Sequence, residues 1–173
     1  NQCVAHCKYK LRMKIKTIDN FLDKDQFKKI EQILFGSNVP WYYTDSVASP
    51  KDKSGYFFIH HLYFDDAYQS KFANDVLLPI IYKLSFKKLL RARINCYPKV
   101  SKIIYNELHT DCDFPHKVAL FSLNTNNGFT YFKDKSRIYS KANQIILFDG
   151  KTKHGSVMQT DTNLRININI NYI

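Results

Sequence analysis

The chain has 173 residues, of which 45% are hydrophobic, with only five glycines and five prolines. This length and composition fit one globular domain and exclude an intrinsically disordered chain. No apolar run approaches the roughly 20 residues of a membrane span and no signal peptide is visible, so we expect a cytoplasmic protein. The formal net charge of +11 favours anionic partners, nucleic acid among them, although scattered lysines are also typical of a basic solvated surface.

The first half of the chain is predicted to mix helices with short strands. Residues 13–19 alternate in hydrophobicity as a strand does. Asp23 is a suitable N-cap for a helix at about 24–35, which carries one apolar face. The aromatic run 56–64 is β-like, and a longer helix, divided at a proline, is expected at about 66–86.

From residue 89 onward the chain is nearly all predicted strand. The expected strands are 91–97, 102–109, 117–124, 129–133, 137–140, 144–150, 154–159 and 164–170. Helices followed by many short strands predict an α+β, mainly β fold, a double-stranded β-helix of the jelly-roll or cupin type with the N-terminal helices packed on one sheet. We expect a single domain over residues 1–173, helical to about residue 88 and barrel-like from about residue 89.

One strand end carries a histidine and an aspartate two residues apart, His109 and Asp111. Residues i and i+2 of a strand share a face, so both side chains can point into one cavity. His154 follows a turn signal and begins another predicted strand. Two histidines and one carboxylate form the facial triad of non-haem iron(II) oxygenases. Each residue alone is a weak signal, because isolated histidines are more often structural.

Arg165 strengthens the metal interpretation. It begins an alternating run that places Asn167, Asn169 and Asn171 on its own face and isoleucines on the other. In a closed barrel the isoleucines would pack between the sheets or under the helices, and the polar face would line a cavity or solvent. An arginine beside such a cavity is suited to hold a carboxylate with two parallel hydrogen bonds.

The segment from about residue 89 to 170 resembles the 2-oxoglutarate/iron(II) oxygenase superfamily, and is most similar to small phage and bacterial prolyl 4-hydroxylase-like members. The stretches 15–27 and 40–43 also resemble that group, so the resemblance covers nearly the whole chain. The matching stretches are NCYP (95–98), HTD (109–111), SLNTNNGFTYF (122–132), ANQIILFDGKTKHGS (142–156) and LRIN (164–167). The order of His-x-Asp, distal His and Arg is specific for the superfamily and not for a substrate.

The resemblance implies that His109, Asp111 and His154 are the catalytic metal ligands and hold Fe(II). It implies that Arg165 binds the distal carboxylate of 2-oxoglutarate, the cosubstrate that is consumed with O₂. Ascorbate is a further candidate cofactor. The implied reaction is hydroxylation of a substrate, coupled to decarboxylation of 2-oxoglutarate to succinate and CO₂.

The resemblance extends to three further cosubstrate-binding candidates. Tyr97 matches a tyrosine near the cosubstrate in prolyl hydroxylases and AlkB-type demethylases, and Asn95 and Asn167 match asparagines of the AlkB type. The alternative for both asparagines is an internal polar contact of the barrel. Ser122 stands where some prolyl hydroxylases have a carboxylate-binding tyrosine, so Arg165 is expected to have less help at this position.

Three functions remain open from the sequence. The leading one is a prolyl 4-hydroxylase-like enzyme that acts on a protein, a peptide or a small molecule, in the host cytoplasm if the chain is encoded by a phage. An AlkB-like nucleic-acid demethylase is favoured by the charge and disfavoured because no second arginine follows Arg165 before residue 173. A non-catalytic binding barrel with a vestigial site is the third.

The sequence holds two other groups of possible ligands. Cys3, His6 and Cys7 are close in sequence, but a structural zinc site normally needs four ligands. The pair His60–His61 and the single His116 are interpreted as structural or substrate-facing, since a further histidine on the metal would break the facial pattern.

Overall fold

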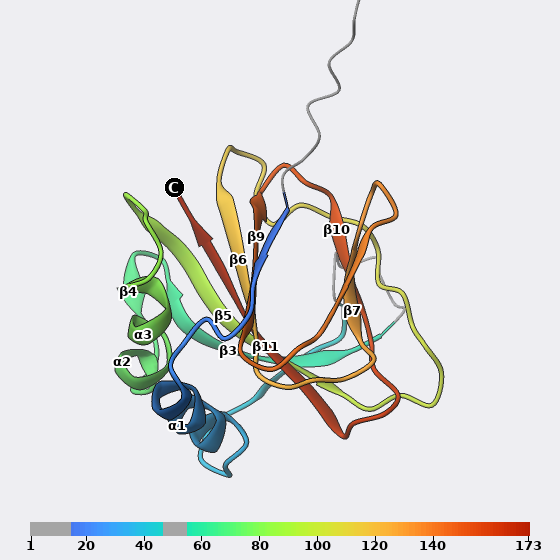
Figure 1. Cartoon of the computed structure of the whole chain (residues 1–173), viewed down its shortest axis with the longest axis horizontal. Coiled ribbons are helices and arrows are strands. Elements are labelled where there is room, and N and C mark those ends of the chain that lie inside the picture. The colour runs from blue at the N-terminus through green and yellow to red at the C-terminus, as the bar shows by residue number, and fades with distance from the viewer. Residues whose placement is uncertain (1–14, 47–54) are drawn as a thin grey trace, which may run out of the picture.

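The computed structural model describes residues 15–46 and 55–173, and it has three layers: helices, a large sheet and a small sheet (Figure 1). The helices are α1 (Lys24–Leu34), α2 (Ala73–Val76) and α3 (Leu78–Ile81). The strands are β1 (Lys16–Ile18), β2 (Tyr42–Thr44), β3 (Phe57–Phe64), β4 (Ala67–Tyr68), β5 (Leu89–Pro98), β6 (Lys117–Ser122), β7 (Phe129–Phe132), β8 (Arg137–Tyr139), β9 (Gln144–Asp149), β10 (His154–Val157) and β11 (Leu164–Tyr172).

The large sheet has the order β1-β9-β6-β11-β5-β3-β2, with β4 paired to β3, and the small sheet has the order β10-β7-β8. All the pairings are antiparallel. The last strand, β11, lies in the middle of the large sheet and pairs with both β5 and β6. Two facing antiparallel sheets joined in this crossed order confirm the predicted mainly β, jelly-roll-type fold with helices packed on one sheet.

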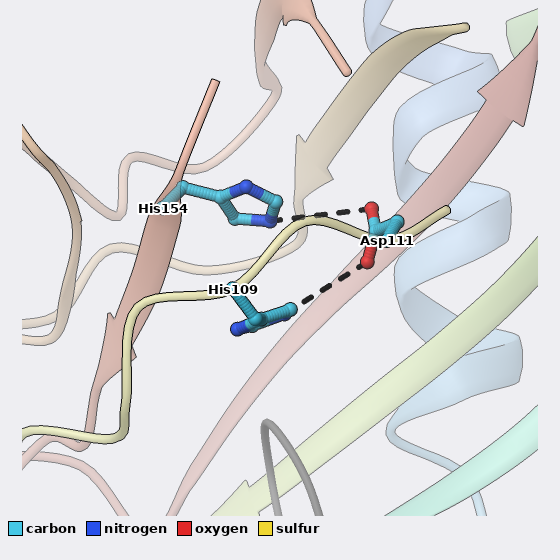
Figure 2. Close-up of side chains that lie close together, drawn as sticks. All are labelled: His109, Asp111 and His154. Carbon is cyan, nitrogen blue, oxygen red and sulfur yellow. Dashed lines mark ion pairs between the residues drawn. The ribbon is translucent and has the colours of Figure 1, made fainter. Parts of the chain in front are cut away.

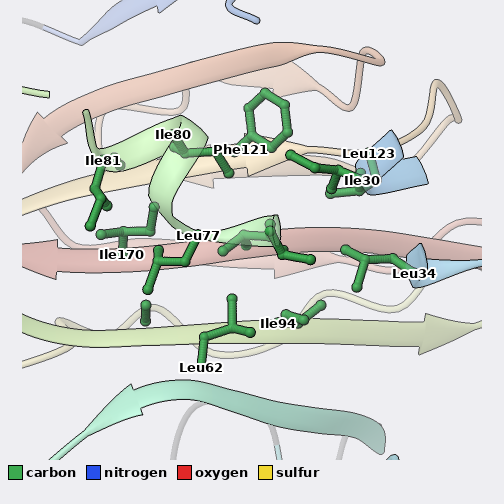
Figure 3. Close-up of a cluster of buried hydrophobic side chains, with 14 of the residues drawn as sticks. Ile30, Leu34, Leu62, Leu77, Ile80, Ile81, Ile94, Phe121, Leu123 and Ile170 are labelled. Carbon is green, nitrogen blue, oxygen red and sulfur yellow. The ribbon is translucent and has the colours of Figure 1, made fainter. Parts of the chain in front are cut away.

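The helices cover the outer face of the large sheet. Asp23 caps α1 by accepting a hydrogen bond from the Gln26 backbone N–H at 2.9 Å, and the helix buries Ile30 and Leu34. These side chains lie in one apolar cluster with residues of α2, α3 and the sheet (Figure 3). The cluster includes Leu62, Val76, Leu77, Ile80, Ile81, Ile94, Phe121, Ile166, Ile168 and Ile170. The isoleucines of β11 therefore pack under the helices.

The inner face of the large sheet looks toward the small sheet. A second apolar cluster closes one part of this interior and consists of Val118, Leu120, Phe132, Ile146 and Phe148. The rest of the inner face is polar, because alternate residues of β5 and β11 on this side are arginines, asparagines and a tyrosine. A cavity opens there, and it carries the candidate site.

The helix expected at about 66–86 is wrong in its first part. Asp65 and Asp66 adopt positive φ angles of 53° and 54°, which fits a tight hairpin turn, and β4 pairs back onto β3. Only the short helices α2 and α3 follow. Residues 40–46, by contrast, contribute a strand, β2, so the part of the chain before residue 89 supplies β1 to β4 as well as the helices.

The strand expected at 102–109 is also wrong, because this segment makes only two isolated bridges, Tyr105 with Val157 and His109 with His154. Between them the backbone N–H and the side-chain amide of Asn106 both donate to the Ser156 carbonyl at 3.0 Å, and the Asn106 carbonyl accepts from the Tyr131 hydroxyl at 2.6 Å. The cluster of Cys3, His6 and Cys7 and the start of the expected strand at 13–19 lie outside the described residues. The extent of the domain over the whole chain stays a prediction.

Candidate metal centre

His109 and His154 face each other across a two-residue bridge at the edge of the small sheet. The backbone N–H of each donates to the carbonyl of the other at 3.0 Å. The two imidazole rings lie 4.8 Å apart, and His154 also packs edge-on against Phe148. Backbone pairing therefore fixes the positions of two side chains that are far apart in the sequence.

Each of the two imidazoles has one nitrogen already committed. Nδ1 of His109 lies 3.1 Å from the Glu107 carbonyl, and Nδ1 of His154 lies 3.1 Å from the Thr152 carbonyl. A carbonyl only accepts hydrogen bonds, so Nδ1 carries the proton and Nε2 has a free lone pair. This is the tautomer in which a histidine binds a metal through Nε2 while its other nitrogen orients the ring.

Asp111 completes the group (Figure 2). Its Oδ1 lies 3.9 Å from Nε2 of His109, and its Oδ2 lies 4.0 Å from Nε2 of His154. These distances are too long for hydrogen bonds, and all the ligand atoms of the three residues fall within 4.8 Å of one another. The donor set of two imidazoles and one carboxylate fits iron(II), with one face of the ion left open.

The Asp111 carboxylate is held from the sheet side by residues that the sequence did not assign. Asn171 donates to its Oδ2 at 2.8 Å and Asn169 at 3.2 Å. Nη2 of Arg91 lies 3.1 Å from Oδ1 as an ion pair, and Nε of Arg91 donates to Asn171 at 3.0 Å. The side chain is therefore oriented before any ion arrives.

The charges of the site suit metal binding. Burial opposes the ionisation of Asp111, but the charges of His154 and Arg91 and the hydrogen bond from Asn171 outweigh it, so the pKa of Asp111 is well below its usual range. Burial lowers the pKa of His154, with His109 adding to the effect against the pull of Asp111. With His154 neutral at pH 7, the permanent charge of Arg91 and the hydrogen bond from Asn171 still favour the ionised form of Asp111. A carboxylate and two neutral imidazoles are the required ligand states.

Arg165 lies in the same cavity and is only 2% exposed. Its Nε donates to Ser140 Oγ at 2.7 Å, and its Nη1 donates to Ser156 Oγ at 2.6 Å and to the Val157 carbonyl at 3.3 Å. Gly128 allows this close packing, since a Cβ there would come within 2.8 Å of the Arg165 side chain. Burial lowers the pKa of Arg165, and no carboxylate of the described ranges pairs with it. A buried, unbalanced guanidinium is a natural anchor for an anion.

The other predicted cosubstrate residues lie beside Arg165, and Tyr97, Asn95 and Asn167 all line the cavity. The guanidinium carbon of Arg165 lies 5.2 Å from the centre of the Tyr97 ring, and the Tyr97 ring stacks on the Phe57 ring. Asn95 donates to Asn167 at 2.9 Å, which is the internal polar contact given above as the alternative. Ser122 is buried on β6 opposite Asn167.

The inner face holds further polar residues that sequence reasoning missed. Arg91 and Arg93 share the alternation of Asn95 and Tyr97 on β5, and this spacing could have placed all four on one face. Ser140 and Ser156 gave no comparable signal, since they approach Arg165 only through the pairing of β7 with β8 and β10.

The three other histidines of residues 15–46 and 55–173 lie outside the triad. His60 is held by the Pro40 carbonyl at 2.9 Å and by Ser70 Oγ at 2.7 Å, which is a structural role. His116 is buried, with Nδ1 bonded to the Phe114 carbonyl at 2.8 Å. His61 pairs in register with Arg93 on the inner face.

No family model and no curated protein matches the sequence. The structure is nevertheless similar to solved oxygenases. A Trichoplax adhaerens prolyl hydroxylase, in complex with a hypoxia inducible factor peptide fragment, has a TM-score of 0.59 at 14% identity, covering 92% of this chain and 83% of that one. A 2OG-Fe(II) oxygenase family oxidoreductase from Burkholderia pseudomallei has a TM-score of 0.62 at 10% identity, with 91% and 84% covered.

A third similar structure is HygX from Streptomyces hygroscopicus, with nickel and 2-oxoglutarate bound, which has a TM-score of 0.60 at 12% identity and covers 92% of this chain and 82% of its own. Within residues 15–46 and 55–173, no helix has the length and apolar character needed to cross a membrane. The chain has the double-stranded β-helix fold of the 2-oxoglutarate/iron(II) oxygenases.

Proposed function

We propose that this protein is an Fe(II)- and 2-oxoglutarate-dependent dioxygenase that hydroxylates its substrate and converts 2-oxoglutarate to succinate and CO₂. One observation carries the proposal: His109 and His154, which form a possible metal-binding group with Asp111, line the same cavity as a buried and unbalanced Arg165. The group offers a metal with an open face, and Arg165 offers a carboxylate anchor. A dicarboxylate that chelates the metal at one end needs both.

Different side chains would bind the iron and the cosubstrate. His109, Asp111 and His154 would hold the iron, and Arg165 would bind the distal carboxylate of 2-oxoglutarate. Bound iron(II) would supply the redox chemistry with O₂. Tyr97 and the aliphatic wall of the cavity would exclude water from the cosubstrate, because little solvent reaches them. Asn95 and Asn167, bonded to each other, would present their remaining polar atoms to the same compound.

For the substrate, we propose a prolyl 4-hydroxylase-like reaction on a peptide or protein. The support is the likeness to a prolyl hydroxylase whose structure holds a peptide fragment. An AlkB-like demethylase of nucleic acid is the second candidate, and the net charge of +11 favours it. The third candidate is a non-catalytic barrel, which would have the same fold but would form no succinate.

The first experiment measures succinate formation with iron(II), O₂, 2-oxoglutarate and ascorbate, in the absence of another substrate. The wild-type protein should form succinate slowly. Asp111→Ala should form no more than metal-free protein does, and it should lose binding of nickel as measured by calorimetry. Asp113→Ala is the matched control, because Asp113 is an exposed carboxylate two residues away. Equal activity of the two variants would refute the metal assignment.

The cosubstrate assignment has its own test. Arg165→Ala should bind nickel normally and require more 2-oxoglutarate for half-maximal succinate formation. The loss of a charge-assisted pair predicts roughly a 10- to 100-fold increase. If Arg165→Ala needs no more 2-oxoglutarate than the wild-type protein does, Arg165 does not bind the distal carboxylate.

The substrate is tested with a proline-rich peptide and methylated oligonucleotides, followed by mass spectrometry. Gain of one oxygen by the peptide supports prolyl hydroxylation. Loss of methyl groups from the oligonucleotide alone supports the AlkB-like candidate. Failure to form succinate under all conditions, in protein that binds nickel, supports the non-catalytic barrel.

A further inference from the structure

A second arginine, Arg93, lies in the cavity with His109 and His154. It belongs to the inner face of β5 and pairs in register with Asn169 of β11, whose amide touches the Asp111 carboxylate. Arg93 is therefore one cross-strand neighbour away from the candidate metal ligands. None of the roles proposed above uses it.

The contacts of Arg93 leave its outer nitrogens available. Its Nε donates to Asn95 Oδ1 at 2.8 Å, and its guanidinium lies 5.5 Å from the centre of the Phe57 ring. Within the described residues no acceptor meets its two terminal nitrogens. The guanidinium is thus held through its Nε by an amide and lies against an aromatic ring, while its terminal nitrogens remain available as paired donors for a carboxylate or phosphate.

The charges around Arg93 are not balanced by the protein. Burial and the neighbouring Arg91 both lower the pKa of Arg93, yet a guanidinium stays protonated in proteins. Tyr97 and Asp111 act in the opposite direction, but the one carboxylate of the two, Asp111, already pairs with Arg91. The charges of three guanidiniums and a divalent metal would be opposed by those of one aspartate and the two carboxylates of 2-oxoglutarate, so two positive charges would remain in this partly buried region. An anion is needed to offset them.

We infer that Arg93 binds a carboxylate or phosphate group of the prime substrate, which is therefore an acidic compound or an acidic stretch of peptide. The inference rests on the proposed function and adds the charge of the molecule that is hydroxylated.

The proposed anion site is separate from that of 2-oxoglutarate. Arg165 rests on the ring of Tyr97 and Arg93 rests on the ring of Phe57, and these two rings stack at 5.1 Å. Arg165 is also tied to serines of the small sheet, whereas Arg93 belongs to the large sheet alone. Both arginines come from neighbouring strands of the large sheet, but their side chains are held by different partners within the one cavity.

The test uses zinc-substituted protein saturated with 2-oxoglutarate, so that the Arg165 site is filled and no turnover occurs. Acetate and inorganic phosphate are titrated separately, and binding is followed by NMR through the Nε–H resonances of the arginines. The Nε–H of Arg93 should shift with saturation by at least one of the two anions. The anion that binds more tightly identifies the acidic group as a carboxylate or a phosphate.

Arg93→Met should weaken binding of that anion about tenfold or more, the effect of losing a charge-assisted pair, while the affinity for 2-oxoglutarate stays the same. Arg137→Met is the matched control, because it removes the same charge and a similar stack on an aromatic ring, Phe129 at 5.3 Å, outside the cavity. If Arg93→Met does not fold, Arg93→Gln carries the same expectation.

Three results would overturn the inference: anion binding that survives in the Arg93 variants, no shift in wild-type protein that binds 2-oxoglutarate, or a loss of 2-oxoglutarate affinity in Arg93→Met as large as in Arg165→Ala. The last would make Arg93 a cosubstrate residue. Failure of the wild-type protein to bind zinc and 2-oxoglutarate at all would instead overturn the proposed function, and the inference with it.

Discussion

The two faces of β5 and β11 are made of alternate residues of the same two strands, and they differ completely in chemistry. Ile94, Ile166 and Ile168 lie against the helices in the main apolar cluster. Their immediate neighbours Arg93, Arg165 and Asn167 lie in the cavity. Both faces are shielded from solvent, so burial alone does not explain the difference.

This comparison separates stability from function. The outer face gains free energy from apolar burial and tolerates few changes of volume. The inner face buries charges and amides, which cost free energy unless each finds a partner. Several of its residues find partners in one another, as Asn95 does in Asn167, and Asn169 and Asn171 both donate to Asp111. A sheet that served folding alone would be more stable with apolar residues here, which supports a role in binding.

The largest expected effect comes from the outer face. Ile168→Ala should lower the free energy of unfolding by about 2–5 kcal/mol, because Ile168 is fully buried and its removal leaves a cavity. Urea denaturation measures the loss. The folded variant should bind zinc as tightly as wild type, and a parallel loss of zinc affinity would show that the two faces are not independent.

The next effect should come from the inner face of the same strand. Asn171→Ala removes the 2.8 Å hydrogen bond to Asp111 and the acceptor for Arg91 Nε. Residues that orient a metal ligand typically contribute about 10- to 100-fold in metal affinity. Calorimetry with zinc measures this, and Asn169→Ala, with the longer bond of 3.2 Å, should have a smaller effect. If both variants bind zinc as tightly as the wild-type protein does, Asn171 does not orient the metal ligand Asp111.

Most strands of the barrel core were predictable, some from short apolar runs bounded by turn residues and the last from strict alternation. The predicted strands at 117–124, 144–150 and 164–170 overlap β6, β9 and β11 almost completely. The error at residues 66–86 has a local cause. Apolar residues at helical spacing gave a helical pattern, but two aspartates with positive φ turned the chain back as a hairpin.

The candidate site was predictable to the extent that its residues share short-range patterns. The alternation around Arg165 indicated the polar face of β11, and His109 and Asp111 were assigned together from their spacing. The residues that orient them were not found. Ser140 and Ser156 reach Arg165 through pairing between strands distant in the sequence, and no local spacing predicts such contacts.

The next prediction concerns His60, one of two adjacent histidines on opposite faces of β3, and the dependence of the free energy of unfolding on pH. Burial lowers the pKa of His60 below its ordinary value of 6.5 in the folded protein. Below pH 6.5 the unfolded chain therefore binds more protons than the folded protein does. The free energy of unfolding then decreases as the pH is lowered, until the pH lies below the folded-state pKa. One such proton contributes at most about 1.4 kcal/mol per pH unit. In His60→Gln, the free energy of unfolding between pH 8 and pH 5 should depend less on pH, and an unchanged slope would contradict the assignment.

The smallest expected effect concerns His61, which lies next to His60 and on the opposite face. Burial lowers the pKa of His61, and the charges of Arg93 and Arg91 lower it further. Arg93→Met removes a positive neighbour and should raise the pKa of His61, because its protonated form then meets less repulsion. The pKa of His60, for which burial is the lowering cause, should stay the same. NMR titration of both imidazoles measures the pair in one sample. If both pKa values move together, the substitution has loosened the whole strand, whereas a shift of His61 alone shows that the excess positive charge is confined to the cavity side of the sheet.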